Sequence, residues 1–262
     1  RIFQTAVIIL FLLMAKAGFG VSPEFELIRR KIVAELMASP VNDAKVKELV
    51  ATLKSDGTWP DINYVDVSRE GFENRIHHAN MVVMARAYKT KTSAFYKSKK
   101  VKSAIEAALK HWVEKDYICD NWHPNQIGTP SNMVYLMLMM GNESPADLVQ
   151  KAQPIIGRAH LTASGARPSG DRIKIAGILA KNLLFLGDEP QFAEVMKVIE
   201  GEIKFATGQR GMQHDYSFHH REDRVNNTLS YGTGYADAFA EWAAYVAGTK
   251  YAFSPEKIRQ LT

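Results

Sequence analysis

Cysteine is nearly absent from this sequence, since its 262 residues contain only Cys119. A single thiol cannot form a disulfide within the chain. No base nearby in the sequence favours a nucleophilic cysteine, so we expect a small buried apolar side chain. The sequence also lacks an acidic cluster typical of a calcium site, and no carboxylate and histidine share a helix at metal-ligand spacing. We therefore expect no metal and no cofactor.

A strong charge of either sign is missing as well. Lysine and arginine number 33 against 28 acidic residues, which gives a net charge of +5 and a pI near 9.1. This mild excess suits an anionic partner, such as a nucleic acid, an acidic glycan or a membrane surface, without choosing among them. No predicted helix carries a basic stripe with interleaved aromatic residues, so we expect no nucleic-acid partner.

The N-terminus carries a conspicuous apolar run. Arg1 precedes the apolar residues 6–14, and the small-x-small sequence Ala-Lys-Ala follows at 15–17. This pattern predicts a cleaved secretory signal peptide over residues 1–20, because the run is too short for an ordinary transmembrane helix; a buried helix is the alternative. We therefore expect a secreted or periplasmic protein with no membrane anchor after cleavage, and a mature domain over residues 21–262.

Strand-like alternation is absent, and helical periodicity dominates the rest of the chain. Apolar residues from Phe25 to Leu36 share one helix face, and Asn42 is placed to cap a helix that extends to Leu53. Further helices are predicted over residues 72–90, 98–115, 130–140, 145–156, 171–186, 190–205 and 233–248, and one more after Pro255. The sequence thus predicts an all-α protein of nine or ten helices, paired in a ring with its loops on one face. The missing initiator Met and the end soon after the last helix start indicate a domain truncated at its C-terminus.

Four loop segments concentrate polar and aromatic residues. They lie at residues 59–69, 120–130, 162–172 and 213–232. Trp59 stands on the first loop and Trp122 on the second. A Trp on a loop rich in Pro, Asn and Gly is either a core side chain or a platform on which sugar rings stack, and the sequence leaves both interpretations open.

The fourth loop is the richest in groups that can transfer protons. It contains His214, His219, His220, Arg221, Asn226, Asn227 and Tyr231. β-Elimination of a uronic acid needs a group that neutralises the carboxylate, a base that removes the C5 proton, and an acid that protonates the leaving oxygen. Asn or Arg can serve as the first, His or Tyr as the second, and Tyr as the third. A tyrosine base would need a cationic neighbour such as Arg221 or a protonated histidine, because its ordinary pKa is about 10. The alternatives are a hydrogen-bonded surface loop and a metal site built from the three histidines.

These segments, in this order, resemble the polysaccharide lyase family that includes chondroitin AC, hyaluronate and xanthan lyases. The Asp-x-Asn-Tyr-x-Asp-x-Ser-Arg stretch at residues 61–69 is similar to the family's early loop. Asn-Trp at 121–122, followed by Gln-Ile-Gly-Thr-Pro at 126–130, is similar to its aromatic patch. Asp-Tyr-Ser-Phe-His at 215–219 and Ser-Tyr-Gly at 230–232 resemble its catalytic His–Tyr segment.

The resemblance implies a fold and an activity. The fold is an incomplete toroid of paired helices, followed in the family by β-sandwich domains. The activity is cleavage of acidic polysaccharides of the chondroitin sulfate or hyaluronan type by a secreted enzyme, by β-elimination and without a cofactor; we expect a monomer. Tyr231 matches the catalytic Tyr, and His220 is the best match to the catalytic His, with His219 close behind. Asn121 and Trp122 match the patch that holds sugar rings.

The residue that neutralises the carboxylate departs from the family pattern. Where the family has an Asn, this chain reads Arg167 followed by Pro. The role therefore passes to Arg167, to Asn226 or to Asn227. Arg221 and Trp59 are further candidates for contacts with the substrate.

Two other functions compete with the lyase interpretation. A glycoside hydrolase on the same helical ring would need two carboxylates across a groove. Loop carboxylates available for this are Asp120, Asp171 and Asp215. A non-catalytic glycan-binding protein would use the His–Tyr loop only as a binding rim. The lyase interpretation predicts that His220, Tyr231 and Trp122 line one cleft.

Overall fold

A computed structural model describes residues 20–261, so the predicted signal peptide, apart from Gly20, lies outside the described residues. Within them the chain is almost entirely helical, which confirms the all-α class. The α-helices are α1 (Pro23–Ala38), α2 (Asp43–Thr52), α3 (Arg75–Lys89), α4 (Lys99–Lys115), α5 (Thr129–Met140), α6 (Ala146–Ile156), α7 (Gly170–Leu186), α8 (Glu189–Gly201), α9 (Thr233–Val246) and α10 (Pro255–Leu261). None of them is both long and apolar enough to cross a membrane.

Short elements connect or extend the helices. Two π-helical turns, η1 (Pro124–Gly128) and η3 (Thr228–Gly232), run directly into α5 and α9. A 3-10 turn, η2 (Gly141–Glu143), follows α5, and the two-residue strands β1 (Gly211–Met212) and β2 (Phe218–His219) pair antiparallel. The sequence did not predict these π-helical turns or strands, because segments of two to five residues carry too little periodicity.

The helix boundaries follow local signals. Asn42 caps α2 as predicted, since its side chain accepts a hydrogen bond from the Lys45 amide. The predicted helix over 190–205 was too long, because α8 ends at Gly201. The next residue, Glu202, is buried, and its backbone carbonyl accepts a hydrogen bond from the Tyr235 hydroxyl at 2.9 Å. A tertiary contact therefore ends this helix.

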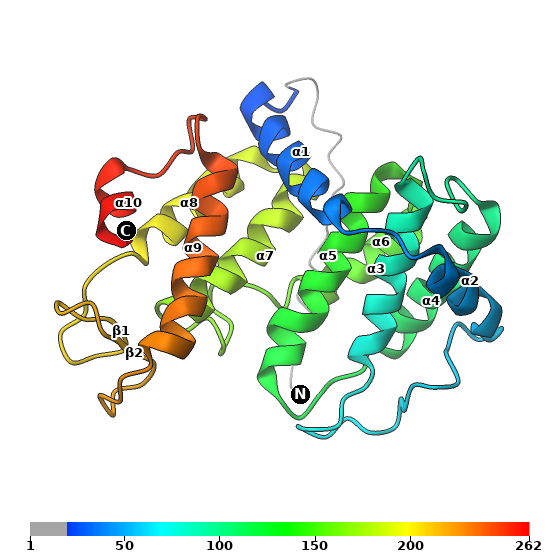
Figure 1. Cartoon of the computed structure of the whole chain (residues 1–262), viewed down its shortest axis with the longest axis horizontal. Helices are drawn as coiled ribbons and strands as arrows, with labels where there is room; N and C mark the ends of the chain where they lie inside the picture. Colours follow the sequence, from blue (N-terminus) through cyan, green and yellow to red (C-terminus); the bar gives the residue numbers. More distant parts are fainter. Residues whose placement is uncertain (1–19, 262) are drawn as a thin grey trace, which may run out of the picture.

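The helices form two rows. The helices α3, α5, α7 and α9 pack side by side in chain order as an inner row, and α4, α6 and α8 pack behind them. Helix α1 lies across α5, α7 and α9 (Figure 1). Each of the four inner helices begins at its lower end in Figure 1, so their N-terminal ends point to one side of the molecule. The helical pairing agrees with the sequence analysis, while closure into an incomplete toroid stays a prediction.

Parallel inner helices have an electrostatic consequence. The N-terminal end of a helix carries a partial positive charge of about half an elementary charge, which favours anions nearby. The start of α7 and the turns that lead into α5 and α9 lie on this side of the molecule (Figure 1). The fold therefore gives this side a partial positive charge.

Candidate active site

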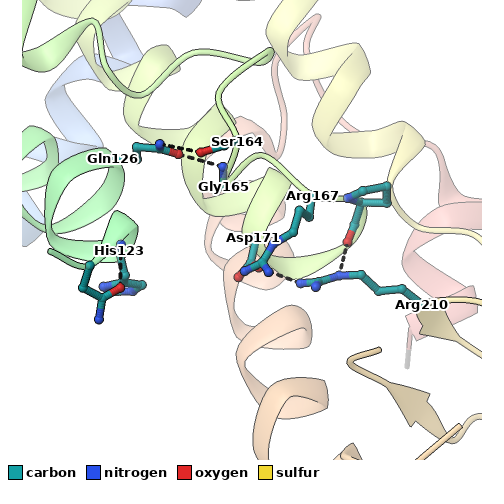
Figure 2. Close-up of polar contacts among 9 residues, drawn as sticks. His123, Gln126, Ser164, Gly165, Arg167, Asp171 and Arg210 are labelled. Carbon is teal, nitrogen blue, oxygen red and sulfur yellow. Dashed lines mark hydrogen bonds and ion pairs between the residues drawn. The ribbon is translucent and has the colours of Figure 1, made fainter. Parts of the chain in front are cut away.

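Trp122 lies just before η1, where the chain turns from α4 toward α5. The Asn121 side-chain oxygen accepts a hydrogen bond from the His123 amide at 3.1 Å, which fixes the turn that presents the indole. Gly165, in the loop between α6 and α7, packs against the ring so closely that a Cβ there would lie 2.2 Å from it. The Gly165 amide also donates to Gln126 Oε1 at 2.7 Å (Figure 2). These contacts seat one side of the Trp122 indole against the loop that leads to α7.

A carboxylate in the first turn of α7 holds two arginines. Asp171 Oδ2 accepts hydrogen bonds from Arg210 Nη2 at 2.6 Å and from Arg167 Nη2 at 3.0 Å (Figure 2). Arg210 Nε donates in addition to the Pro168 carbonyl at 2.8 Å. The Arg167 guanidinium lies over the Trp122 ring, 4.7 Å from its centroid. A continuous set of contacts thus leads from Trp122 to Arg210.

His220 and Tyr231 stack face to face, with ring centroids 3.4 Å apart and planes 5° from parallel. His220 directly follows β2 and is 7% exposed, whereas Tyr231 lies in η3 and is 50% exposed. Two hydrogen bonds bring the segments together: the Asn227 amide donates to the Phe218 carbonyl at 2.7 Å, and the Phe218 amide donates to Thr228 Oγ1 at 2.9 Å. The short strand and the π-helical turn therefore act as one unit that fixes the His–Tyr pair.

His220 lines a cavity of about 340 Å³ together with three arginines, Arg167, Arg210 and Arg221. The cavity also contains one carboxylate among its described lining residues, that of Glu222. Asp171, behind the lining, pairs with Arg167 and Arg210, so the three arginines still outnumber the two carboxylates and leave the cavity with a positive excess.

The pKa of His220 lies below its ordinary value. Burial of the imidazole is the largest cause, the charge of Arg210 adds to it, and Asp171 acts in the opposite direction. Above this lowered pKa the imidazole is neutral and can accept a proton. Arg210 also interacts electrostatically with Tyr231, whereas the sequence analysis had named Arg221 as the cationic neighbour of this tyrosine.

Of the three residues predicted to line one cleft, His220 alone is among the described residues that line this cavity. His220 lines the cavity, Tyr231 stacks on it, and Trp122 contacts Arg167, which lines the same cavity. Neither Trp122 nor Tyr231 is one of the described lining residues, and we call the position of Trp122 beside Arg167 the rim of the cavity.

Trp59 does not belong to this group, and the prediction that it stacks on sugar rings is wrong. It is 1% exposed, its Nε1 donates to the Leu49 carbonyl at 3.0 Å, and its ring packs edge-on against His77 with centroids 4.9 Å apart. Both faces of the indole are enclosed in the core of the first half of the chain.

Three other residues predicted to belong to the site do not line the cavity. His219 precedes His220 in the chain, and successive residues along a strand point to opposite faces, so its side chain lies outside the cavity. Asn227 acts through its backbone, because its carbonyl accepts hydrogen bonds from the amides of Ser230 and Gly232 at the start of η3. Asn121 positions its neighbour Trp122 through the turn described above.

The sequence analysis missed Arg210 and did not recognise Asp171 as the anchor of two arginines. The spacing of four residues between Arg167 and Asp171 was a usable signal, because residues four apart lie on one side of a helix. Arg210 sits in a loop without any motif, and only the tertiary contact reveals its role. No three His, Cys, Asp or Glu side chains converge on a possible metal site in the described residues.

Comparison with known proteins reveals clear relatives. Chondroitinase-AC of Pedobacter heparinus is 29% identical over 237 residues, which cover 89% of this chain and 33% of the relative. A solved structure of a chondroitinase AC lyase matches with a TM-score of 0.84 and 26% identity, over 91% of this chain and 35% of that chain. A Paenibacillus xanthan lyase shares the fold, with a TM-score of 0.69 and 18% identity over 91% of this chain and 24% of its own. The chain therefore spans about a third of the length of its first relatives.

The sequence profile of polysaccharide lyase family 8, N-terminal alpha-helical domain, matches residues 30–262. This range includes Tyr231, every described residue that lines the cavity with His220, and the turn that contains Trp122. The chain belongs to polysaccharide lyase family 8, of which it carries the N-terminal α-helical domain.

Proposed function

We propose that the protein is a secreted lyase that cleaves uronic-acid-containing polysaccharides of the chondroitin sulfate or hyaluronan type by β-elimination. The observation that carries the proposal is the stacked pair of His220 and Tyr231 beside a cavity lined by arginines. The names of the relatives, a chondroitinase and chondroitin AC and xanthan lyases, support an acidic polysaccharide as the substrate.

In this mechanism an arginine first neutralises the substrate carboxylate, which makes the neighbouring C5 proton more acidic. Arg167 is the better placed, because its side chain is 44% exposed whereas that of Arg210 is 13% exposed and fully engaged by Asp171 and a backbone carbonyl. Of the asparagines considered for this role, Asn226 already uses its side-chain oxygen to accept hydrogen bonds from Thr228.

The proton transfers follow from the state of the two stacked rings. Neutral His220 accepts the C5 proton, and the electrons of the C–H bond form the C4–C5 double bond as the C4–O bond breaks. The Tyr231 hydroxyl donates its proton to the leaving oxygen. His220 then releases its proton to water, and the Tyr231 oxygen takes up a proton from water, which restores both residues. Trp122 supports a sugar ring at the rim.

The glycoside hydrolase is less well supported than the lyase. It needs a pair of carboxylates across the cleft, and Glu222 is the one carboxylate among the described residues that line the cavity. Asp171 is occupied by two arginines, and Asp215 accepts hydrogen bonds from Ser217 in a loop outside the cavity. A hydrolase would therefore lack its second partner here.

The deciding experiment measures ultraviolet absorbance during incubation with chondroitin sulfates, hyaluronan, xanthan and alginate. Because the chain spans a third of its relatives, both this chain and the full-length protein from its source are assayed. We expect absorbance to rise from the new C4–C5 double bond with at least one uronic-acid polymer. Tyr231→Phe should reduce the rate by about 100-fold or more, because it removes the proton donor. Tyr216→Phe is the matched control, since this exposed tyrosine of the same loop lies outside the cavity.

Each other outcome identifies a different function. New reducing ends without any absorbance change would establish a hydrolase. Binding of the polymers without cleavage, by wild type and Tyr231→Phe alike, would establish a glycan-binding protein. Equal loss of activity in both tyrosine variants would contradict the role given to Tyr231.

Secretion is part of the proposal and has its own test. A bacterial host that expresses the chain from its first residue should release a protein that begins near residue 18 to 21, because the small-x-small sequence precedes this point. Mass spectrometry of the released protein measures the cleavage site. An uncleaved protein that stays in the cytoplasm would contradict the assignment of residues 1–20 as a signal peptide.

A further inference from the structure

A second cavity, of about 170 Å³, opens between the inner helices α5, α7 and α9. Its lining includes Ser131 and Tyr135 of α5, Lys174 and Gly177 of α7, and Trp242 of α9. It lies apart from the cavity that contains His220, with which it shares no lining residue.

Several polar groups on this lining lack a partner in the described part of the chain. They are the Lys174 ammonium, the hydroxyls of Ser131 and Tyr135, and the indole N–H of Trp242. Trp242 as a whole residue is only 2% exposed, whereas Lys174 is exposed. Gly177 makes room for this indole, because a Cβ at that position would lie 2.4 Å from Trp242 Nε1. The ammonium and the indole can only donate hydrogen bonds, so the cavity suits a ligand rich in acceptor oxygens.

The other lysine on the lining is already satisfied. Lys181 forms an ion pair with Glu241 at 2.6 Å and lies within 5.7 Å of the ring centroids of three aromatic residues. Lys174 is therefore the cation that remains available to a ligand in this cavity. Its ammonium lies beside Gly234 of α9, where a Cβ would approach it to 3.3 Å.

This cavity lies next to the candidate active site. Lys174 follows Asp171, the anchor of the two arginines, by three residues on α7, so the two side chains emerge on one side of the helix. His123, beside Trp122, interacts electrostatically with both Lys174 and Asp171. A polymer that extends from the His220 cavity along α7 would reach Lys174 next.

We infer that the cavity between α5, α7 and α9 is a second sugar subsite, which takes an acidic sugar unit of the same polymer with its anionic group against Lys174. The inference rests on the proposed function. The Tyr135 and Trp242 side chains supply aromatic surface for the sugar ring, and the free hydroxyls and the indole N–H supply hydrogen bonds to its oxygens. The anionic group is either a sulfate or a carboxylate, and the substrates of the test separate the two.

The test compares Lys174→Ala with wild type on chondroitin sulfate and on hyaluronan, which carries carboxylates but no sulfate. We expect KM to rise about fivefold to tenfold, because a hydrogen-bonded charge is lost, while kcat changes by less than about twofold. Lys174→Arg should restore most of the affinity. Lys197→Ala is the control, because this lysine is an exposed surface cation on α8, paired with Glu194. The loss should shrink at high salt, since the contact is exposed.

The pattern across substrates identifies the anionic group. A loss confined to chondroitin sulfate assigns the contact to a sulfate, and an equal loss on both polymers assigns it to a carboxylate. An unchanged KM on both polymers, in an active enzyme, overturns the subsite and leaves the proposed function intact. If the wild type cleaves neither polymer, the proposed function fails. Binding of the same polymers, measured by calorimetry, then decides the subsite. Equal affinity of wild type and Lys174→Ala, or no binding by either protein, overturns the subsite.

Discussion

The molecule contains two clusters built from the same types of residue. The first, between α2, α3 and α4, combines Trp59, Tyr64, His77 and Trp112. The second, at the start of α5, α7 and α9, combines Trp122, Arg167, Asp171, Arg210, His220 and Tyr231. Each has histidine, tyrosine and tryptophan, and each includes a loop that the sequence marks as a candidate for sugar binding.

Burial and charge separate the two clusters. Trp59, His77 and Trp112 are at most 1% exposed, and burial lowers the pKa of His77 to about 3. The Tyr64 hydroxyl hydrogen-bonds to His77 Nδ1 at 2.9 Å, and the Ala108 carbonyl lies 3.0 Å from His77 Nε2, so both ring nitrogens of His77 have partners. The second cluster has a half-exposed Tyr231 and an open cavity with arginines. A catalytic histidine needs a partly accessible cavity and charged neighbours, and the residue type alone does not report either.

The largest difference between the clusters should appear in stability. Trp59→Ala should lower the free energy of unfolding by about 3–5 kcal/mol, because it removes a fully buried indole from the core. Trp122→Ala should cost about 1 kcal/mol or less, because this ring is partly exposed, yet it should weaken polysaccharide binding. Urea denaturation followed by circular dichroism measures both. Equal losses of stability in the two variants would contradict the conclusion that Trp59 is a core residue and Trp122 is not.

A change at Arg210 should move the pH dependence of the reaction. The proposed mechanism requires neutral His220, so the activity should fall as the pH drops through the lowered pKa of that group. Arg210→Gln removes one cause of the lowering, so the pKa should rise toward its ordinary value near 6.5 and the acid limb of kcat/KM should shift to higher pH. Arg210→Lys keeps the charge and should shift the limb less. A limb that stays in place in Arg210→Gln would exclude this electrostatic role.

The smallest effect is expected at the packing of the rim. Gly165→Ala would place a methyl group 2.2 Å from the Trp122 ring, so the indole must move. We expect KM for the polymer to rise about threefold to tenfold with kcat nearly unchanged, because the change affects binding and not proton transfer. Gly201→Ala is the control, since nothing lies within 4 Å of its Cβ position. An unchanged KM would remove Trp122 from the substrate contacts.

Much of the fold could be predicted from the sequence because helices depend on local signals. The apolar spacing from Phe25 to Leu36 and the cap at Asn42 specified α1 and α2 closely. The end of α8 could not be predicted, since the contact between Glu202 and Tyr235 joins residues 33 positions apart. The π-helical turns η1 and η3 escaped for a similar reason, as they arise where the chain is fitted against the site.

The candidate site was predictable in part. The sequence order of its motifs singled out His220, Tyr231 and Trp122 as candidate site residues. The local sequence, however, gave Trp59 and Trp122 the same two interpretations, a core side chain or a platform for sugar rings. Whether an indole faces a core or a cleft depends on the helices packed around it, which are distant in sequence.

By itself, the sequence determined the helical class and the resemblance to a lyase family, and it singled out His220 and Tyr231 as candidates, because periodicity and short motifs are local properties of the chain. Only the tertiary structure decided that Trp59 is core, that Arg210 and Arg167 share Asp171, and that Lys174 stands free beside a second cavity. These decisions depend on burial and on distances between segments far apart in the chain, such as Ser131 of α5 and Trp242 of α9, which are separated by 111 positions. Packing sets such distances, and no local pattern of residues encodes them.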